Sequence, residues 1–363
     1  MTRILVISNY RNKVTSRPEA EIFVRLANEK KVEVTVMTVA DSFYGQQLRE
    51  AGARVIDFLP FKKFDKEEIA FIHEELVKGQ YDILHLFYSA AIINGLRAAK
   101  DMPVKVIVYR GLTGNVHWYD PTLYFKVLSP RVDKIWCNSL SVKEQIDAQW
   151  FVDKNKTVVI TKGHDKTWYE GVEKADLSGF GIQAEDFVAV TVANDRKMKG
   201  LKYLLKAIEM IDPDVGIKLI IIGGDDTFRE KYTKRIHRNR DKIIFTGHRF
   251  DNLQIVKACN VSISSSIKGE SFQKSVAEAM HLGICPVITD IPGNKGMVEE
   301  KKSGLIIPKK NARAIKDALM YLYSNKHLCE EYGNNAREHI TQNFDIQETV
   351  KKVMAMYDDL LAT

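Results

Sequence analysis

The sequence predicts an α/β protein with two doubly wound domains, each a parallel sheet covered by helices on both faces. Short, strongly apolar runs alternate with helix-like segments along the chain, which is typical of parallel strands buried on both sides. The length of 363 residues favours two hydrophobic cores over one. A break in this pattern near the middle of the chain separates the strands into two sets.

The expected strands follow the apolar runs in order. The first set comprises residues 4–7, 32–38, 83–87, 104–109, 134–137 and 157–160. The second set comprises residues 187–192, 218–222, 242–246, 261–264, 286–289 and 305–307. Doubly wound sheets hold their ligands at the C-terminal ends of the strands, so we expect functional residues in the loops that follow these runs.

The domain boundary is expected between residues 161 and 170, which lack periodicity and include Gly163. The predicted division is an N-terminal domain of residues 1–165, a C-terminal domain of residues 166–345 and a final segment of residues 346–363. Apolar residues recur at helical spacing between Ile346 and Leu361, so that segment is predicted to be a helix.

Composition excludes several classes of protein. With 45% hydrophobic and 28% charged residues the chain is an ordinary globular one, and no apolar run approaches the ~20 residues that span a bilayer. The N-terminal apolar run predicts a buried strand rather than a signal peptide, and four widely spaced cysteines indicate reduced thiols, so we expect a cytoplasmic protein. The net charge of +7 favours an anionic partner, but no nucleic-acid-binding module accompanies it.

The most informative segment is residues 269–280, Gly-Glu-Ser-Phe-Gln-Lys-Ser-Val-Ala-Glu-Ala-Met. A helix is expected from residue 272 to residue 282, preceded by Ser271 and ended by Gly283. Free N–H groups at its start favour a phosphate, and the acidic acceptors Glu270 and Glu278 suit hydroxyl groups. A nucleotide-sugar carries both. The alternative is an amphipathic helix with one solvated glutamate.

The flanking residues strengthen the ligand interpretation. Gly283-Ile-Cys-Pro-Val and Gly304-Leu-Ile-Ile-Pro follow the motif, and together the segments resemble the retaining glycosyltransferases of family 4, which carry E-x-F-G-x4-E-A-M. The resemblance implies the GT-B fold, two Rossmann-like domains facing a central cleft. It implies that Glu270 faces the transferred sugar and Glu278 the ribose, with the backbone of Ser271, Phe272 and Gln273 near the donor. Ser271 and Gln273 stand where the family has glycines.

A basic loop opens the second domain at residues 194–200. Cations there can neutralise a departing diphosphate, although a solvated loop would look the same. The family places an arginine and a Lys-Gly pair against the donor diphosphate. Lys199-Gly200 matches the pair, and Arg196 is our choice for the arginine, with Lys197 as its competitor.

The first domain resembles the family less closely. Asp82-Ile-Leu-His85 resembles the family's D-[IV]-[IVL]-H at a strand end, which places His85 on the acceptor and sugar side, although a lone histidine there is more often structural. Arg110 stands where many members have a histidine, and Gly111–Asp120, with Asn115, is expected to lie on the acceptor side. The family's early Gly-Gly is missing, and Arg17 is expected to replace its phosphate contact.

We therefore expect a retaining, metal-independent hexosyltransferase with a nucleotide-sugar substrate and no cofactor. Asp212 and Asp214 belong to a turn, so no metal is assigned. The acceptor is expected to be a glycan, a lipid-linked saccharide or a small molecule in bacterial cell-envelope polysaccharide or lipopolysaccharide synthesis. Lys62 and Lys63, between Phe61 and Phe64, could contact an anionic membrane peripherally. The alternatives are another GT-B enzyme, such as an epimerase or phosphorylase, and a non-catalytic sugar-nucleotide-binding protein.

Overall fold

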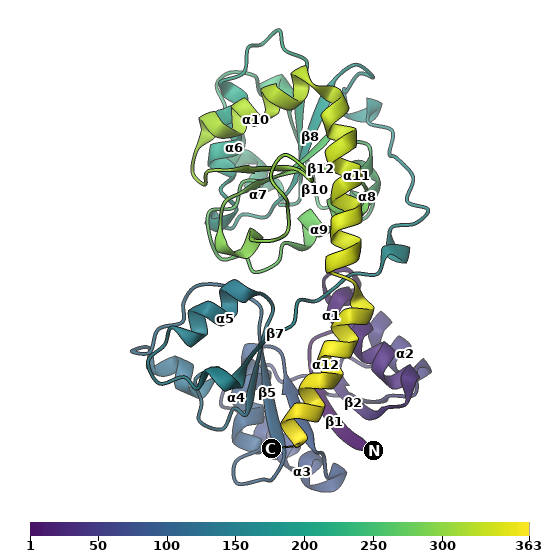
Figure 1. Cartoon of the computed structure of the whole chain (residues 1–363), viewed down its shortest axis with the longest axis vertical. Coiled ribbons are helices and arrows are strands. Elements are labelled where there is room, and N and C mark those ends of the chain that lie inside the picture. Colours follow the sequence, from purple (N-terminus) through teal and green to yellow (C-terminus); the bar gives the residue numbers. More distant parts are fainter. Residues whose placement is uncertain (363) are drawn as a thin grey trace. The chain divides into compact units, whose positions relative to one another are not determined.

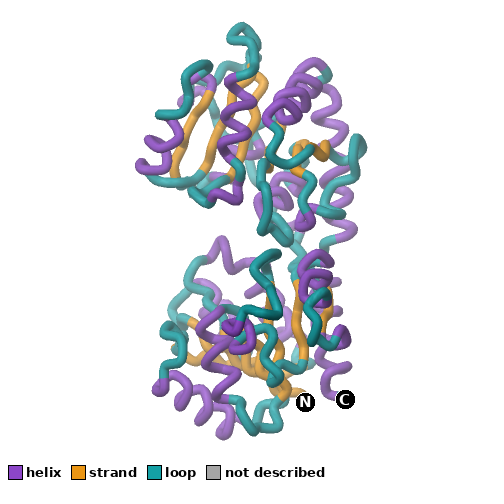
Figure 2. The backbone as a smooth tube through the Cα atoms, turned by 90° about the vertical axis from the view of Figure 1, so that its left-hand side faces the viewer, coloured by secondary structure: helices purple, strands orange, loops and turns teal. Residues whose placement is uncertain are grey.

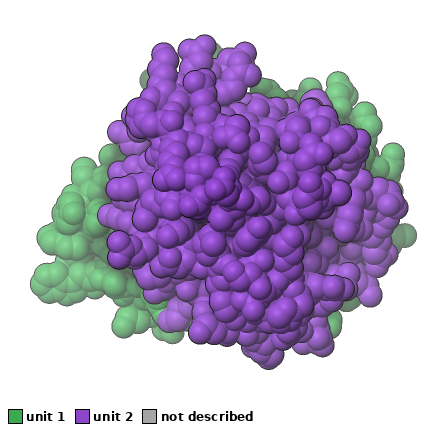
Figure 3. Space-filling model, turned by 90° about the horizontal axis from the view of Figure 1, so that it is seen from above, with its two compact units in different colours: residues 1–163, 346–363 green, residues 164–345 purple. Residues whose placement is uncertain are grey.

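The computed structural model describes residues 1–362, which form two compact units (Figure 3). Unit 1 contains residues 1–163 and the C-terminal segment that starts at Ile346, and unit 2 contains residues 164–345. The chain passes from unit 1 to unit 2 two residues before the position expected from the sequence. Each unit has its own parallel sheet and its own core.

The sheet of unit 1 has the strand order β3-β2-β1-β4-β5-β6-β7, with every neighbouring pair parallel. Its strands are β1 (Thr2–Ile7), β2 (Val32–Thr38), β3 (Arg54–Asp57), β4 (Ile83–Leu86), β5 (Lys105–Arg110), β6 (Lys134–Cys137) and β7 (Thr157–Val159). The helices that connect them are α1 (Lys13–Glu29), α2 (Phe43–Glu50), α3 (Lys66–Gly79), α4 (Ser89–Ala98) and α5 (Leu140–Asp147).

The sheet of unit 2 has the order β10-β9-β8-β11-β12-β13, again parallel throughout. Its strands are β8 (Phe187–Val192), β9 (Ile217–Ile222), β10 (Ile243–Gly247), β11 (Val261–Ser264), β12 (Cys285–Thr289) and β13 (Leu305–Ile307). Its helices are α6 (Leu201–Glu209), α7 (Asp226–Thr233), α8 (Asn252–Lys257), α9 (Lys274–His281), α10 (Ala312–Ser324) and α11 (Lys326–Asn343). In Figure 2 the strands lie between helices in each unit.

The C-terminal helix α12 (Ile346–Leu361) has the predicted bounds and belongs to unit 1. Its apolar stripe, including Val350, Val353 and Leu360, is buried, and it packs beside α1 (Figure 1). The Tyr357 hydroxyl lies 3.0 Å from His85 Nδ1 and so ties the helix to strand β4.

Two local predictions were wrong. Strand β3 was missed because Arg54-Val-Ile-Asp57 contains only two apolar residues and lies at the edge of its sheet. Helix α9 begins at Lys274, two residues later than expected, with Gln273 as its N-cap residue. The Phe272 ring packs against Phe344, at 5.0 Å between centroids, which keeps residues 271–273 in a loop. Its C-terminal end agrees with the expectation, since Gly283 follows the cap with a φ of 75°.

Candidate functional site

The sheet of unit 2 reverses its direction of winding between β8 and β11. The chain builds β9 and β10 on one side of β8 and then crosses over to build β11, β12 and β13 on the other. At such a point the loops after the two central strands diverge, which leaves room for a ligand at their C-terminal ends. Lys199 follows β8, and Glu270 follows β11.

Close backbone packing joins these two loops. Gly200 has a φ of 66°, and a Cβ at this position would lie 2.0 Å from the carbonyl oxygen of Ser265. Two hydrogen bonds hold the same contact, from Ser265 Oγ to the Lys199 carbonyl at 2.9 Å and from Ile267 N to the Met198 carbonyl at 2.7 Å. Only glycine fits at residue 200, because any side chain would force the loops apart.

Lys199 and Glu270 form an ion pair at the junction of the loops. The Lys199 Nζ lies 2.8 Å from Glu270 Oε1, and the two side chains keep 20% and 12% of their surface exposed. Ser266 Oγ donates a 3.1 Å hydrogen bond to the same carboxylate oxygen. The pair is therefore held in place while remaining accessible to a ligand.

A third loop, after β12, supports Glu270 from behind. A Cβ on Gly293 would lie 1.8 Å from the Glu270 carbonyl oxygen, so the turn at residues 292–294 presses directly on the backbone of the motif. Thr289 Oγ1 donates to the Ser266 carbonyl, and Asn294 Nδ2 donates to the Thr289 carbonyl at 2.8 Å. Glu270 is thus positioned by the loops that follow three adjacent strands.

Helix α9 carries the second acidic residue of the motif. Glu278 is 8% exposed and pairs with Lys274 one turn earlier. The side chain of the N-cap residue Gln273 forms no capping hydrogen bond, which leaves the first N–H groups of the helix suited to an anion. Ser271 and Gln273 beside it are 5% and 3% exposed, and Gln273 Nε2 has no hydrogen-bond partner among residues 1–362. A buried donor without a partner is costly, which favours a ligand contact for it.

Arg196 and Lys197, the two further cations of the basic loop, have fewer contacts than Lys199. Arg196 precedes the short 3₁₀ turn Lys197–Lys199, and its N–H contacts Asn194 Oδ1 at 3.3 Å. The side chains of Arg196 and Lys197 are both exposed. The structure therefore pairs Lys199 with Glu270, whereas Arg196 and Lys197 remain alternatives for the family's arginine.

In unit 1, Arg110 is the last residue of β5, and Gly111 and Asn115 lie in the loop that follows it. The Arg110 guanidinium donates to the Leu112 carbonyl at 3.1 Å and to the Gly114 carbonyl at 2.7 Å, and burial lowers its pKa. Arg110 therefore organises this loop. Asn115 is exposed with a φ of 55°.

Arg17 and His85 lie elsewhere in unit 1. Arg17 is on α1, partly exposed, where its charge acts on the Tyr44 hydroxyl. His85 is fully buried among Phe23, Phe87 and Trp136, and burial lowers its pKa well below the ordinary value of 6.5. His85 is a packing residue in this structure, contrary to our expectation that it faces the acceptor.

The sequence interpretation missed Ser266, Lys274, Thr289 and Asn294. Lys274 had a local signal, because it stands four residues before Glu278, the spacing of helical ion pairs. Ser266 follows its strand in a serine-rich loop but has no signal that identifies its partner. The fold alone brings Thr289 to Ser266 and Asn294 to Thr289, so neither contact had a local signal.

Comparison with known proteins agrees with this geometry. The model for "Glycosyl transferases group 1" matches residues 173–339, and the model for "Glycosyltransferase Family 4" matches residues 21–168, so together they match most of the chain. The chain is a family 4 glycosyltransferase. The transferase has the GT-B fold, as the resemblance implied.

Individual relatives are distant. An uncharacterized glycosyltransferase of Methanocaldococcus jannaschii, MJ1069, is 26% identical over 257 residues, which are 68% of this chain and 63% of the relative. The Escherichia coli UDP-Gal:alpha-D-GlcNAc-diphosphoundecaprenol alpha-1,3-galactosyltransferase is 24% identical over 82% of this chain and 80% of its own length. Among solved structures, Anabaena Alr3699/HepE in complex with UDP covers 99% of the transferase and 100% of its own chain, at 18% identity and a TM-score of 0.78.

Proposed function

We propose that the transferase is a retaining, metal-independent enzyme that moves a hexose from a nucleotide-sugar to an acceptor in cell-envelope polysaccharide synthesis. The observation that carries the proposal is the Lys199–Glu270 pair at the β8–β11 switch point, with Glu278 and the uncapped start of α9 beside it. These groups supply a cation, N–H donors and two carboxylates, which match the diphosphate and the hydroxyl groups of the donor.

Each part of the donor has a partner in unit 2. Lys199 and the N–H groups at the start of α9 bind the diphosphate, assisted by Arg196 or Lys197. Glu278 accepts hydrogen bonds from the ribose. Glu270 accepts hydrogen bonds from the sugar hydroxyls, and the Gln273 side chain donates to them. Fixed cations stabilise the charge that develops on the leaving diphosphate, so a divalent metal is not needed for that role.

The reaction exchanges one bond to the anomeric carbon for another on the same face of the sugar. The bond from that carbon to the diphosphate oxygen breaks, and a bond to the acceptor hydroxyl oxygen forms. The acceptor proton passes to the departing phosphate oxygen, so no protein side chain has to act as the base. Lys199 stabilises the diphosphate as its negative charge increases.

Calorimetry with UDP in the presence of EDTA tests the donor proposal, followed by product analysis with UDP-galactose and UDP-glucose. UDP is the first choice because the Escherichia coli relative is named for a UDP-sugar. We expect metal-free UDP binding and a product that keeps the α-anomeric configuration of the donor. Strict dependence on magnesium or manganese, or an inverted product, would contradict the proposal. Binding without transfer to any acceptor would favour a non-catalytic sugar-nucleotide-binding protein.

The acceptor is proposed to be a lipid-linked saccharide reached at an anionic membrane surface. No helix among residues 1–362 is long and apolar enough to cross a bilayer. Unit 1 instead exposes six aromatic side chains, here called the aromatic strip: Phe64, Trp118, Tyr124, Phe125, Trp150 and Phe151. The Phe64 ring meets Phe125 at 5.7 Å, Tyr124 donates to the Trp118 carbonyl, Trp118 meets Trp150 at 6.4 Å, and Trp150 stacks on Phe151.

Basic groups accompany the aromatic strip. The Arg97 guanidinium lies over the Phe64 and Phe125 rings, and burial together with the nearby charge of Lys63 lowers the pKa of Lys126. Phe61, beside Lys62, is 86% exposed, and Trp150 is 78% exposed. Exposed aromatic and cationic side chains in one region suit the interface of an anionic bilayer, which attracts both.

Sedimentation with vesicles tests this second part of the proposal. We expect the transferase to pellet with phosphatidylglycerol vesicles and not with phosphatidylcholine vesicles at low salt. Replacing Trp150 and Phe151 by serine should release it, whereas replacing Phe250, an exposed aromatic residue of unit 2, should not. Failure to pellet with either vesicle would favour a soluble acceptor and leave the donor proposal untouched.

A further inference from the structure

His164, the first residue of unit 2, lies in a group of aromatic rings, here called the ring cluster. Its side chain is 2% exposed. Four rings have their centroids 5.6–6.1 Å from the centroid of the His164 ring, and they belong to Trp168, Tyr169, Phe272 and His281. Trp168 and Tyr169 follow closely in the chain, whereas Phe272 and His281 belong to the segment that contains helix α9. The ring cluster therefore joins the start of unit 2 to the helix that carries Glu278.

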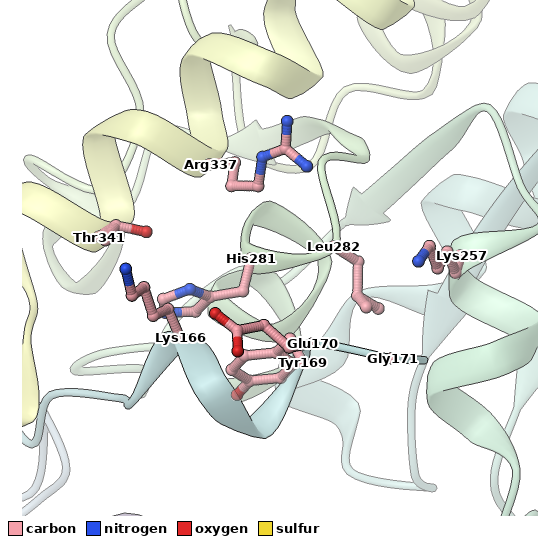
Figure 4. Close-up of a pocket in the computed structure, with 9 residues that line it drawn as sticks. All are labelled: Lys166, Tyr169, Glu170, Gly171, Lys257, His281, Leu282, Arg337 and Thr341. Carbon is pink, nitrogen blue, oxygen red and sulfur yellow. The ribbon is translucent and has the colours of Figure 1, made fainter. Parts of the chain in front are cut away.

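The C-terminal end of α9 is held by ring stacking. His281 is the last residue of the helix, and its ring stacks on Tyr169 with centroids 4.6 Å apart and an interplanar angle of 6° (Figure 4). Burial lowers the pKa of His281 to about 4, so its ring is neutral at physiological pH. The Tyr169 hydroxyl lies 2.7 Å from His164 Nδ1. His281 is thus connected to His164 both directly and through Tyr169.

The Phe272 ring holds the loop at the other end of the helix. It meets the His164 ring edge to face, with an interplanar angle of 83°, and packs against Phe344. The backbone N–H of His164 donates to the Phe344 carbonyl at 2.9 Å, so Phe272 packs on two segments that are hydrogen-bonded to each other. Phe272 follows Glu270 by two residues and precedes Gln273 directly. The backbone that carries both of these residues is therefore anchored through the Phe272 ring.

We propose that His164 and Phe272 are positioning residues, which set the place of α9 and of the loop before it for donor binding. Helix α9 has eight residues and is therefore about 12 Å long, so contacts at both ends fix its direction as well as its position. A displacement of about 1 Å is enough to weaken the action of a binding or reacting group severely. The inference rests on the proposed function of α9 in donor binding, and it assigns the two rings themselves no contact with the donor.

Two variants separate the ring of His164 from its hydrogen bond. His164→Asn keeps a polar group for Tyr169 and removes the ring, whereas the double variant His164→Phe/Tyr169→Phe keeps both rings and removes both partners of the bond. We expect calorimetry to show UDP binding about tenfold weaker for His164→Asn and within about threefold of the unaltered transferase for the double variant.

Tyr323→Leu is the matched control for the loss of a ring. The Tyr323 ring meets Phe187 edge to face, with centroids 5.8 Å apart, at the start of β8. This contact lies at the end of the sheet opposite the C-terminal ends of the strands, where the donor site is proposed. Tyr323→Leu should therefore loosen the core of unit 2 and leave the affinity for UDP unchanged.

Hydrogen exchange measured by mass spectrometry tests the positioning without any ligand. Residues 271–277 should exchange faster in His164→Asn, while residues 312–324 of α10 keep their rate, because a general loss of stability would accelerate both segments. Phe272→Leu removes the other ring from a partly exposed position and should give the same pattern of exchange and the same loss of UDP affinity. It decides the inference if His164→Asn does not fold.

Several results would overturn the inference. They are unchanged exchange at residues 271–277, equal acceleration in α10, and UDP binding by His164→Asn and Phe272→Leu as tight as that of the unaltered transferase. A double variant or Tyr323→Leu as weak as His164→Asn would also overturn it, because the loss could then not be assigned to the rings around α9. Failure of the unaltered transferase to bind UDP would instead contradict the proposed function, and the exchange at residues 271–277 would still show whether His164 positions this loop.

Discussion

The two units contain comparable lysine–glutamate pairs, and the difference between them shows what separates a binding site from a core contact. In unit 2, Lys199 pairs with Glu270 beside close-packed glycine loops, and the two side chains are 20% and 12% exposed. In unit 1, Lys162, which follows β7, pairs with Glu19 of α1, and each side chain is 13% exposed, so exposure alone does not distinguish the two pairs.

The surroundings of Lys162 account for its different role. Its Nζ lies 3.6 Å from the centre of the Tyr109 ring, and Ser8 Oγ donates to the carboxylate of Glu19. Burial alone would lower the pKa of Lys162, yet the charge of Glu19 raises it, so the lysine stays protonated. The same pair of residue types is structural in one unit and suited to ligand binding in the other.

The largest expected effect comes from breaking the unit 1 pair. Lys162→Met should lower the free energy of unfolding by about 3–5 kcal/mol, because Glu19 would remain as a buried charge without its partner. Urea unfolding measures this change. The matched control is Lys134→Met, which breaks a pair whose Asp359 is 61% exposed and should cost at most about 1 kcal/mol. Equal losses from the two variants would show that the unit 1 pair is not a buried structural contact.

Removing the lysine of the unit 2 pair should reduce activity strongly and stability little. Lys199→Gln should reduce kcat/KM on the order of 10²-fold, since the lysine stabilises the diphosphate both when bound and as it leaves. Its free energy of unfolding should fall by less than that of Lys162→Met, because the Lys199 side chain is 20% exposed against 13% for Lys162. Lys206→Gln, an exposed lysine on α6, is the control for the lost charge. A stability loss as large as that of Lys162→Met would remove the distinction between the pairs.

Changing the acid of the unit 2 pair separates turnover from affinity. Glu270→Gln should lower kcat by about 10-fold to 10²-fold, because the charge acts on the transferred sugar, while the affinity for UDP, which lacks that sugar, stays unchanged. Steady-state kinetics and UDP calorimetry give the two quantities. Glu185→Gln, at an exposed position of unit 2, should change neither. A parallel fall in UDP affinity and kcat would place Glu270 on the nucleotide instead.

The site in unit 2 could be predicted from the sequence because the residues that indicate it lie close together in the chain. Glu270 and Glu278 lie eight residues apart on one loop and helix, and the Lys199-Gly200 turn follows a strand directly. Local spacing together with the resemblance to family 4 led to the prediction of these positions, and parallel-strand patterning predicted two doubly wound domains. The late start of α9 escaped prediction, because the Phe272–Phe344 contact that sets it joins residues far apart in the chain.

The unit 1 pair could not be predicted in this way. Glu19 and Lys162 are 143 residues apart, and neither stands in a pattern that distinguishes it from a solvated surface charge. His85 shows the same limit, since its burial depends on Tyr357 of α12, 272 residues later. Local sequence indicates which residue types follow a strand, but their burial is decided by distant segments that pack over them.

The smallest expected effect concerns Glu278, the residue of helix α9 that we propose binds the ribose. Glu278→Gln should weaken UDP binding by about 1 kcal/mol, because the amide keeps one acceptor oxygen but loses the charge. Stability should barely change, since the Lys274–Glu278 pair has the i, i+4 spacing, for which about 0.5 kcal/mol is typical. Calorimetry with UDP and urea unfolding measure the two changes. Lys274→Gln breaks the same pair while keeping the carboxylate, so it should match the stability change and retain UDP affinity. If both variants lost UDP affinity equally, the ion pair rather than the Glu278 carboxylate would be what the nucleotide requires.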